Sequence, residues 1–193
     1  GARPTSAPSA RSNCGGGRNG DDIFVAPADV TDQEQVQAAY AKILDHFGRL
    51  DILLANAGSH LPATASHFDV EAYRELFEIN LFGVLNCIAA VLPDMRRHQS
   101  GHIAGVSSVA GYRALPTAAA YGASKSALTY VLESLRFDLA ADGIAVTVVS
   151  PGFVRTPLTD QNSFPMPCLV EPEFAATTIM DGLQRRAFEI HFP

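Results

Sequence analysis

The sequence predicts an α/β fold in which helices cover both faces of a parallel sheet. Three observations predict it. Short apolar runs alternate with longer segments of helical periodicity, polar or glycine-containing segments directly follow the apolar runs, and 47% of the 193 residues are hydrophobic. The 14 basic and 20 acidic residues give a net charge of −6, so nothing indicates the basic surface of a nucleic-acid-binding protein.

The cysteine and apolar patterns bear on the compartment. Cys14, Cys87 and Cys168 are odd in number and far apart, which predicts free thiols in a reducing, cytoplasmic compartment. No apolar run approaches the ~20 residues of a membrane span, and the first twenty residues lack the apolar core of a secretory signal. The six histidines form no metal-binding pattern, so we expect no metal site.

Residues 1–20 are rich in Gly, Pro, Ser and Arg, and we expect them to be a flexible segment that precedes one domain over residues 21–193. Gly15–Gly20 matches G-x-G-x-x-G, a motif that binds a pyrophosphate only between a strand and a helix. Here no strand pattern precedes the glycines and a strand pattern follows them. A linker is the favoured interpretation and a phosphate site the alternative.

The first elements of the domain follow from pattern and caps. Ile23–Ala28 is apolar and predicts a strand. Thr31 and Glu34 have the spacing of a capping box, which begins a helix that runs to Phe47 and ends at Gly48.

Residues 51–107 predict two strands and one long helix. Asp51–Ala55 and His102–Ser107 are the strands. The helix starts near Val70 and reaches the 90s, where Pro93 is expected to kink or end it.

The last part repeats this alternation. Ala118–Ala140 predicts a helix, Ile144–Val149 a fully apolar strand, and 153–172 a proline-rich loop. Glu173–Arg185 is the last predicted helix, and Phe188–Phe192 begins a strand.

Tyr121 and Lys125 carry the clearest chemical signal. They are four residues apart, so they share one helix face, and an ammonium group near a phenol favours its ionised form. Ser108 ends a predicted strand thirteen residues earlier, and Asn80 lies inside an apolar helix. Each has an ordinary alternative, because Tyr121 and Lys125 can be a surface pair and Asn80 a solvated or locally bonded residue.

In these motifs the sequence resembles the short-chain dehydrogenase/reductase family, whose members have a Rossmann-type fold. The resemblance covers residues 23–192, with the motifs in family order. They are Asp29-Val30, Asn56-Ala57-Gly58, Asn80-Leu81-Phe82-Gly83, Ser107-Ser108-Val109-Ala110-Gly111, Tyr121-x-x-x-Lys125 and Pro151-Gly152-x-Val154-x-Thr156.

The resemblance implies hydride transfer between NAD or NADP and a small-molecule alcohol or carbonyl. Tyr121 would be the general acid or base, and Ser108 would bind the substrate oxygen. Lys125 would lower the pKa of the phenol and hold the nicotinamide ribose, and Asn80 would anchor a water. The implied cofactor-binding residues are Asp29, Val30, Asn56, Ala57, Gly58, Tyr121, Lys125, Pro151, Gly152, Val154 and Thr156.

The sequence also departs from the family pattern. The first two family strands and their glycine-rich turn are not found, so we expect an incomplete doubly wound sheet and weak dinucleotide binding. A catalytically silent fragment or binding module of the same fold is the alternative function. Two helices have apolar residues on more than one side, which predicts a homodimer or homotetramer.

Overall fold

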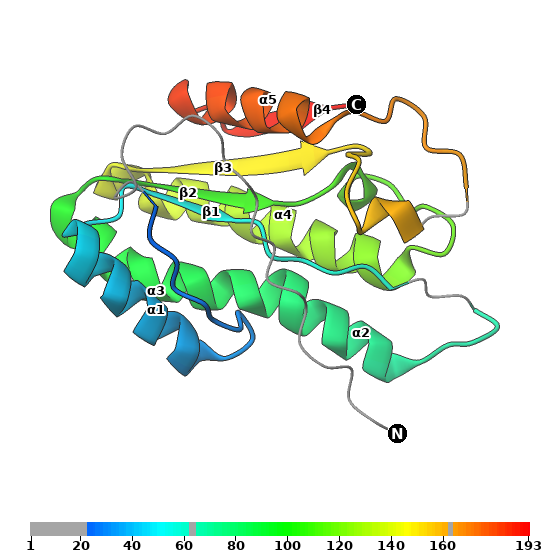
Figure 1. Ribbon diagram of the computed structural model, residues 1–193, viewed down its shortest axis with the longest axis horizontal. Helices are drawn as coiled ribbons and strands as arrows, with labels where there is room; N and C mark the ends of the chain where they lie inside the picture. Colours follow the sequence, from blue (N-terminus) through cyan, green and yellow to red (C-terminus); the bar gives the residue numbers. More distant parts are fainter. Residues whose placement is uncertain (1–22, 62–64, 162–163) are drawn as a thin grey trace.

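A four-stranded parallel sheet forms the centre of the molecule. The structure, a computed structural model, describes residues 23–61, 65–161 and 164–193. The strands β1 (Ile52–Ala55), β2 (Gly101–Val106), β3 (Ile144–Pro151) and β4 (Glu189–Phe192) lie side by side in chain order (Figure 1). All three pairings are parallel. The predicted α/β class with a parallel sheet is therefore confirmed.

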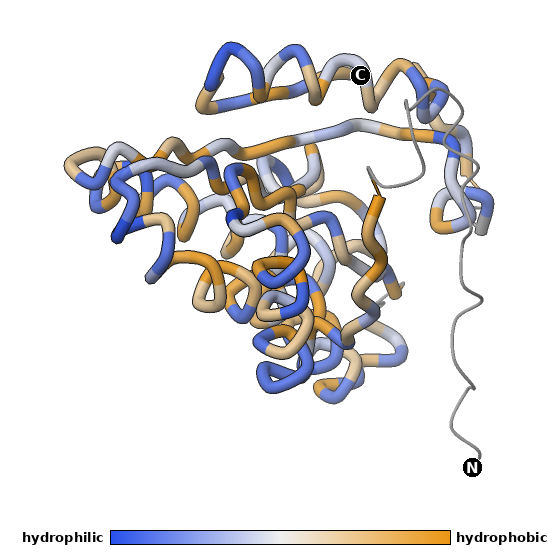
Figure 2. Tube along the Cα trace, turned by 60° about the vertical axis from the view of Figure 1, so that its left-hand side comes forward, coloured by the Kyte–Doolittle hydropathy of each residue, from blue (hydrophilic) through white to orange (hydrophobic). Residues whose placement is uncertain are grey.

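Helices cover both faces of the sheet. Figures 1 and 2 show α5 on one side of the sheet and the other long helices on the opposite side. The helical segments are α1 (Gln33–Phe47), α2 (Val70–Phe77), the π-helix η1 (Glu78–Phe82), α3 (Gly83–His98), the short η2 (Val109–Gly111), α4 (Ala119–Leu139), η3 (Ala140–Asp142), η4 (Thr159–Gln161) and α5 (Pro172–Gln184).

Each face of the sheet has its own apolar core. On the side of α1, α3 and α4, fully buried side chains such as Ile103, Leu128 and Leu132 pack together. On the side of α5, Val149 and Ile190 pack in a smaller cluster. Gly105 of β2 lets α4 approach closely, because a Cβ there would lie 2.6 Å from Leu132 Cδ1. This packing fixes α4 against the strands that lead into the site.

The predicted strand over Ile23–Ala28 is wrong. This segment is extended but belongs to no ladder, and Ile23 and Val25 are 66% and 75% exposed. A strand needs a hydrogen-bonding neighbour. In the described residues β1 pairs only with β2, so β1 is an edge strand, and Phe24 stacks instead on His46 of α1.

The predicted cap of the first helix is shifted by one residue. Asp32, not Thr31, is the N-cap, because its carboxylate accepts hydrogen bonds from the backbone N–H groups of Glu34 and Gln35. Thr31 donates its hydroxyl to Asp29 instead. The predicted end is confirmed, since Gly48 has φ 78°.

Pro93 does not end its helix. The chain stays helical to His98, and the part of the helix after Pro93 packs on the core through Met95, which is 2% exposed. The whole helical stretch Val70–His98 is long and apolar enough to cross a membrane, although sequence analysis expects no span. Of its apolar window, 44% is buried inside the protein.

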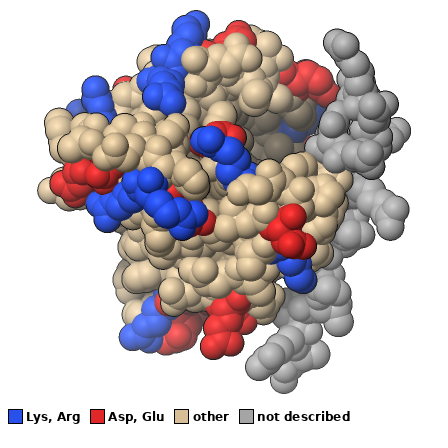
Figure 3. All heavy atoms as spheres, turned by 90° about the vertical axis from the view of Figure 1, so that its left-hand side faces the viewer, with Lys and Arg blue, Asp and Glu red and all other residues tan. Residues whose placement is uncertain are grey.

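The other predicted elements agree with the structure to within two residues at most of their ends. The expected flexible segment 1–20 and its glycine motif lie outside the described residues. At the amino ends of the strands, Arg49 pairs with Asp51 and Arg96 with Asp142. Figure 3 shows basic and acidic side chains interspersed over this end of the molecule.

Candidate active site

A cavity of about 360 Å³ lies at the carboxyl ends of β1, β2 and β3. This is where parallel α/β sheets bind ligands. The lining combines a few hydroxyl, amide and ammonium groups with a larger apolar part. The lining residues are Asn56, Gly58, Ser59, Val106, Ser107, Ser108, Tyr121, Lys125, Pro151, Gly152, Val154, Thr156, Leu158, Thr159, Ala175, Ile179 and Phe192.

Lys125 is the only charged side chain among those lining residues, and it is 3% exposed. Its Nζ donates a hydrogen bond of 2.7 Å to the carbonyl of Val106, the last residue of β2. Burial lowers the pKa of Lys125 to about 8. A buried ammonium with one protein acceptor still has two donors that can bind a ligand in the cavity.

Tyr121 lies one helical turn before Lys125, and the Lys125 Nζ is 5.9 Å from the centroid of its ring. Burial raises the pKa of Tyr121, and a hydrogen bond with Ser108 lowers it. The net direction is opposite to the lowering that the sequence predicts from Lys125. Ser108 begins η2, and its Oγ accepts a hydrogen bond from the backbone N–H of Ala110.

Strand β2 and helix α4 are joined directly beside these groups. The Ser107 hydroxyl donates to the carbonyl of Lys125 over 3.0 Å and contacts the Thr129 hydroxyl at 2.8 Å. These bonds fix the start of α4, and with it Tyr121 and Lys125, to the end of β2. The four-residue spacing of Tyr121 and Lys125 therefore corresponds to a fixed position of both side chains at the end of β2.

Asn80 lies beside the cavity and holds the backbone of Ser59, which lines it. It is fully buried in η1, its Oδ1 accepts from the N–H of Ser59 at 2.8 Å, and its Nδ2 donates to the Ser59 carbonyl at 2.9 Å. Nδ2 also reaches the Ser124 hydroxyl at 3.1 Å. Asn80 thus ties the segment after β1 to α4, and a Cβ on Gly58 would lie 3.3 Å from its Oδ1.

The segment after β3 forms the opposite wall. Gly152 donates its N–H to the Phe192 carbonyl over 2.9 Å, and a Cβ there would lie 2.4 Å from the Pro193 carbonyl carbon. Val154 pairs with Val170 in a parallel bridge. The Thr159 hydroxyl donates to the Val154 carbonyl and accepts from the Thr156 N–H. These two bonds hold residues 154–159 of this wall in place.

Three predicted cofactor-binding residues do not line the cavity. Asp29 is exposed and accepts from the N–H and hydroxyl of Thr31. Val30 packs against Gly83 and accepts a hydrogen bond from Asn86 through its carbonyl. Ala57 is exposed between two lining residues.

Sequence reasoning missed several residues of the site. Ser59, Thr159, Ile179 and Phe192 line the cavity, and His60 contacts Tyr121 with ring centroids 5.0 Å apart. Ser59 and His60 directly follow the Asn56-Ala57-Gly58 motif, which was the available signal. Ile179 and Phe192 carry none, because only the packing of α5 and β4 brings them to the strand ends.

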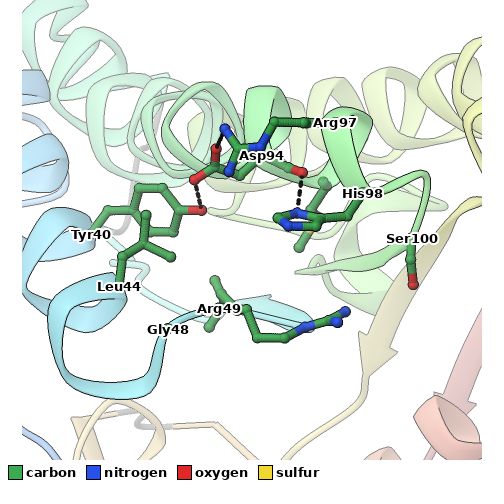
Figure 4. Close-up of a pocket in the computed structure, with 10 residues that line it drawn as sticks. Tyr40, Leu44, Gly48, Arg49, Asp94, Arg97, His98 and Ser100 are labelled. Carbon is green, nitrogen blue, oxygen red and sulfur yellow. Dashed lines mark hydrogen bonds and ion pairs between the residues drawn. The ribbon is translucent and has the colours of Figure 1, made fainter.

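A second, much smaller cavity lies between α1 and α3 (Figure 4). Its volume of about 30 Å³ is close to that of one water molecule. The Tyr40 hydroxyl donates to Asp94 over 2.8 Å, and this bond and burial raise the pKa of Tyr40 to about 12. Asp94 also pairs with Arg97, so the polar groups of this cavity are bonded to one another. Within the described part of the chain, no three His, Cys, Asp or Glu side chains gather to hold a metal ion.

The larger cavity therefore combines a half-buried phenol, a neighbouring hydroxyl and a buried ammonium. A phenol beside a hydroxyl donor can transfer a proton to or from an oxygen atom that both groups contact. The hydroxyl also stabilises negative charge that develops on that oxygen. This arrangement fits proton transfer on an alcohol or carbonyl group.

Comparison with known proteins adds a family profile described as short chain dehydrogenase, which matches residues 6–165. A Myxococcus xanthus protein described as an uncharacterized oxidoreductase is 40% identical over 172 residues. The match covers 89% of this chain and 66% of that protein, so the chain spans just under two thirds of its length.

Solved structures share the fold. A short-chain dehydrogenase from Streptomyces avermitilis has a TM-score of 0.72 at 27% identity, covering 86% of this chain and 69% of the other. The structure of ElxO with NADP bound has a TM-score of 0.73 at 26% identity, covering 84% and 74%.

Proposed function

Because the chain belongs to the short-chain dehydrogenase/reductase family, a family of Rossmann-type oxidoreductases, we propose that it interconverts an alcohol and a carbonyl compound with NAD or NADP as the hydride carrier. The observation that carries this proposal is the convergence of Ser108, Tyr121 and Lys125 on one cavity at the strand ends. The smaller cavity between α1 and α3 is lined by the Tyr40 phenol but by no lysine side chain.

Each residue has a role that its surroundings support. Tyr121 gives its phenolic proton to the substrate oxygen in reduction and takes it back in oxidation. Ser108 donates a hydrogen bond to the same oxygen. Lys125 keeps two donors beyond its bond to Val106, and we assign them to the ribose of the cofactor. Asn80 holds the Ser59 backbone, and its role as the anchor of a water stays part of the proposal.

The cavity fits the nicotinamide end of a dinucleotide. When bound, the nicotinamide supplies or accepts the hydride. Asn56 and Gly58 on one wall and the segment from Pro151 to Thr156 on the other would hold it. Gly58 leaves space beside Lys125 Nζ, because a Cβ there would lie 3.4 Å from that atom, at van der Waals contact. The structure of ElxO, a relative in fold, has NADP bound.

Asp29 and Val30 are proposed for the adenine end of the cofactor, and Ala57 for the backbone segment beside the nicotinamide. They lie outside the described cavity, so these assignments rest on their motifs. The remaining proposals are a cytoplasmic location and assembly into a homodimer or homotetramer. The substrate is proposed to be a small alcohol or carbonyl compound with an apolar body, since Leu158 and Ile179 line the cavity.

Cofactor-dependent turnover tests the proposed function. The purified chain is incubated with NADH or NADPH at millimolar concentration and a panel of apolar ketones and aldehydes. The proposal predicts carbonyl-dependent oxidation of at least one of the two cofactors. A folded chain that oxidises neither would instead favour the catalytically silent binding module.

A further inference from the structure

His60 makes a ring contact with Tyr121 that the proposed chemistry does not use. Its centroid lies 5.0 Å from that of Tyr121, and the two rings are nearly perpendicular at 82°. Such edge-to-face contacts between rings are favourable beyond the area that they bury. Tyr121 therefore has a ring neighbour from the segment after β1, in addition to Lys125 and Ser108 from its own side of the site.

The segment that carries His60 is held rigidly. The preceding residue, Ser59, is bonded through both its N–H and its carbonyl to the fully buried Asn80. Asn80 in turn reaches Ser124, three residues after Tyr121 in α4. The backbone at His60 and the helix turn at Tyr121 are thus connected through one amide, which keeps the two rings in contact.

The imidazole of His60 acts through its ring surface. Within the described residues neither of its ring nitrogens has a hydrogen-bond partner, so packing on Tyr121 is its specific contact. Burial lowers the pKa of His60, with no charged neighbour contributing. The imidazole is therefore neutral at neutral pH and adds no positive charge beside the phenol.

We propose that His60 is a positioning residue for Tyr121, and that its ring holds the phenol against Ser108 and shields it from water. The proposal rests on the proposed function for its catalytic consequence. Its structural content, a half-buried phenol in contact with an imidazole, stands independently of turnover. A misplacement of about 1 Å in a reacting group lowers rates about 100-fold, so a wall that restrains one aromatic ring affects the reaction strongly.

Titration of the Tyr121 phenol tests this without cofactor or substrate. Near-ultraviolet absorbance of tyrosinate is followed against pH in the full chain, and each variant is paired with its Tyr121→Phe double variant to isolate the signal of Tyr121. Since burial raises the pKa of Tyr121, His60→Ala should lower it. His60→Phe, which keeps a ring, should leave it raised. His67→Ala, an exposed histidine of the same loop, should not change it.

Turnover gives the second readout. His60→Ala is expected to lower kcat by about 10- to 100-fold with a nearly unchanged KM for the cofactor, and His60→Phe to restore most of the rate. An unchanged phenol pKa in His60→Ala, with the variant folded, overturns the proposal whether or not the chain turns over. If the phenol shifts as expected and the wild-type chain shows no turnover, the proposed function fails and the positioning contact stands.

Discussion

Among single residues, Asn80 supports the site through backbone contacts. Its side chain makes three hydrogen bonds, two to the backbone of Ser59 and one to Ser124, and it is fully buried. From sequence alone an Asn inside a helix has a solvated or local role. The structure shows that η1 widens the helix at this point, and the amide leaves the helix to bond a distant loop.

Asn80→Ala should lower the free energy of unfolding by about 1–3 kcal/mol, because it leaves buried polar groups without partners. Urea denaturation measures the loss. Asn86→Ala is the matched control, since Asn86 is half-buried in the same helical stretch and donates one bond, to the Val30 carbonyl. Asn86→Ala should lower the free energy of unfolding by less than Asn80→Ala. Equal losses for the two variants would contradict the role assigned to Asn80.

The residues of the site divide into those that sequence can predict and those it cannot. Tyr121, Lys125 and Ser108 could be predicted because helix spacing and a strand end determine their places. His60 could not be predicted as a neighbour of Tyr121, since a bond from Asn80 to Ser59 brings its loop there. The raised pKa of Tyr121 could not be predicted from the sequence either. It results from burial in the folded chain, whose effect outweighs that of the hydrogen bond with Ser108.

At the scale of elements, β2 and β3 are joined by a buried side-chain hydrogen bond as well as by their backbone hydrogen bonds. His102 of β2 is 3% exposed, and its Nε2 lies 2.7 Å from the hydroxyl of Thr147 in β3. That hydroxyl donates its proton to the Ala187 carbonyl, so His102 must be the donor to Thr147. Burial, together with the charge of Arg186, lowers the pKa of His102.

This lowered pKa makes stability depend on pH in one direction. Below the ordinary histidine value of 6.5 the unfolded chain binds a proton that the folded chain resists. Stability is therefore full above pH 6.5 and should fall as the pH is lowered. Urea unfolding at pH 7.5 and about pH 5.5 should show this loss in the wild type and a smaller one in His102→Gln. The same loss in both proteins would contradict the assignment.

Strands were predicted correctly where a segment has both an apolar pattern and a neighbouring strand to pair with. The four ladder strands satisfy both conditions. Ile23–Ala28 has the apolar pattern without a neighbouring strand in the described residues, and a pattern cannot reveal a missing partner. Pro93 shows the opposite case, since core packing of Met95 overrides a local signal to end a helix.

At the scale of the whole molecule, α4 carries large exposed aromatic side chains. Tyr130 and Phe137 are 75% and 78% exposed on the helix that also holds Tyr121 and Lys125. Exposed apolar surface of this kind favours association. The expected homo-oligomer should dissociate in Phe137→Asp, as light scattering at micromolar concentration would show. Met180→Asp, a comparably placed change on α5, should leave the mass unchanged, and a monomeric wild type would refute the prediction.

In the proposed function, the polar groups of the cavity would surround the nicotinamide end of a dinucleotide. Apart from Gly15–Gly20, the sequence has no G-x-G turn for a pyrophosphate. We expect dissociation constants for NADH and NADPH above about 100 µM, which corresponds to roughly −5.5 kcal/mol. Isothermal titration measures them. Tighter binding would show that residues outside the described part complete a pyrophosphate site.

The most direct test of the account is the rate of cofactor-dependent turnover in Tyr121→Phe. This change removes the phenolic proton that the proposed reaction transfers, and it keeps the ring that His60 and Lys125 contact. Tyr130→Phe is the control, because it removes the hydroxyl of an exposed tyrosine on the same helix. The account predicts a loss of about 10²- to 10⁴-fold in Tyr121→Phe and none in Tyr130→Phe. Turnover in Tyr121→Phe equal to that of the wild type would contradict it.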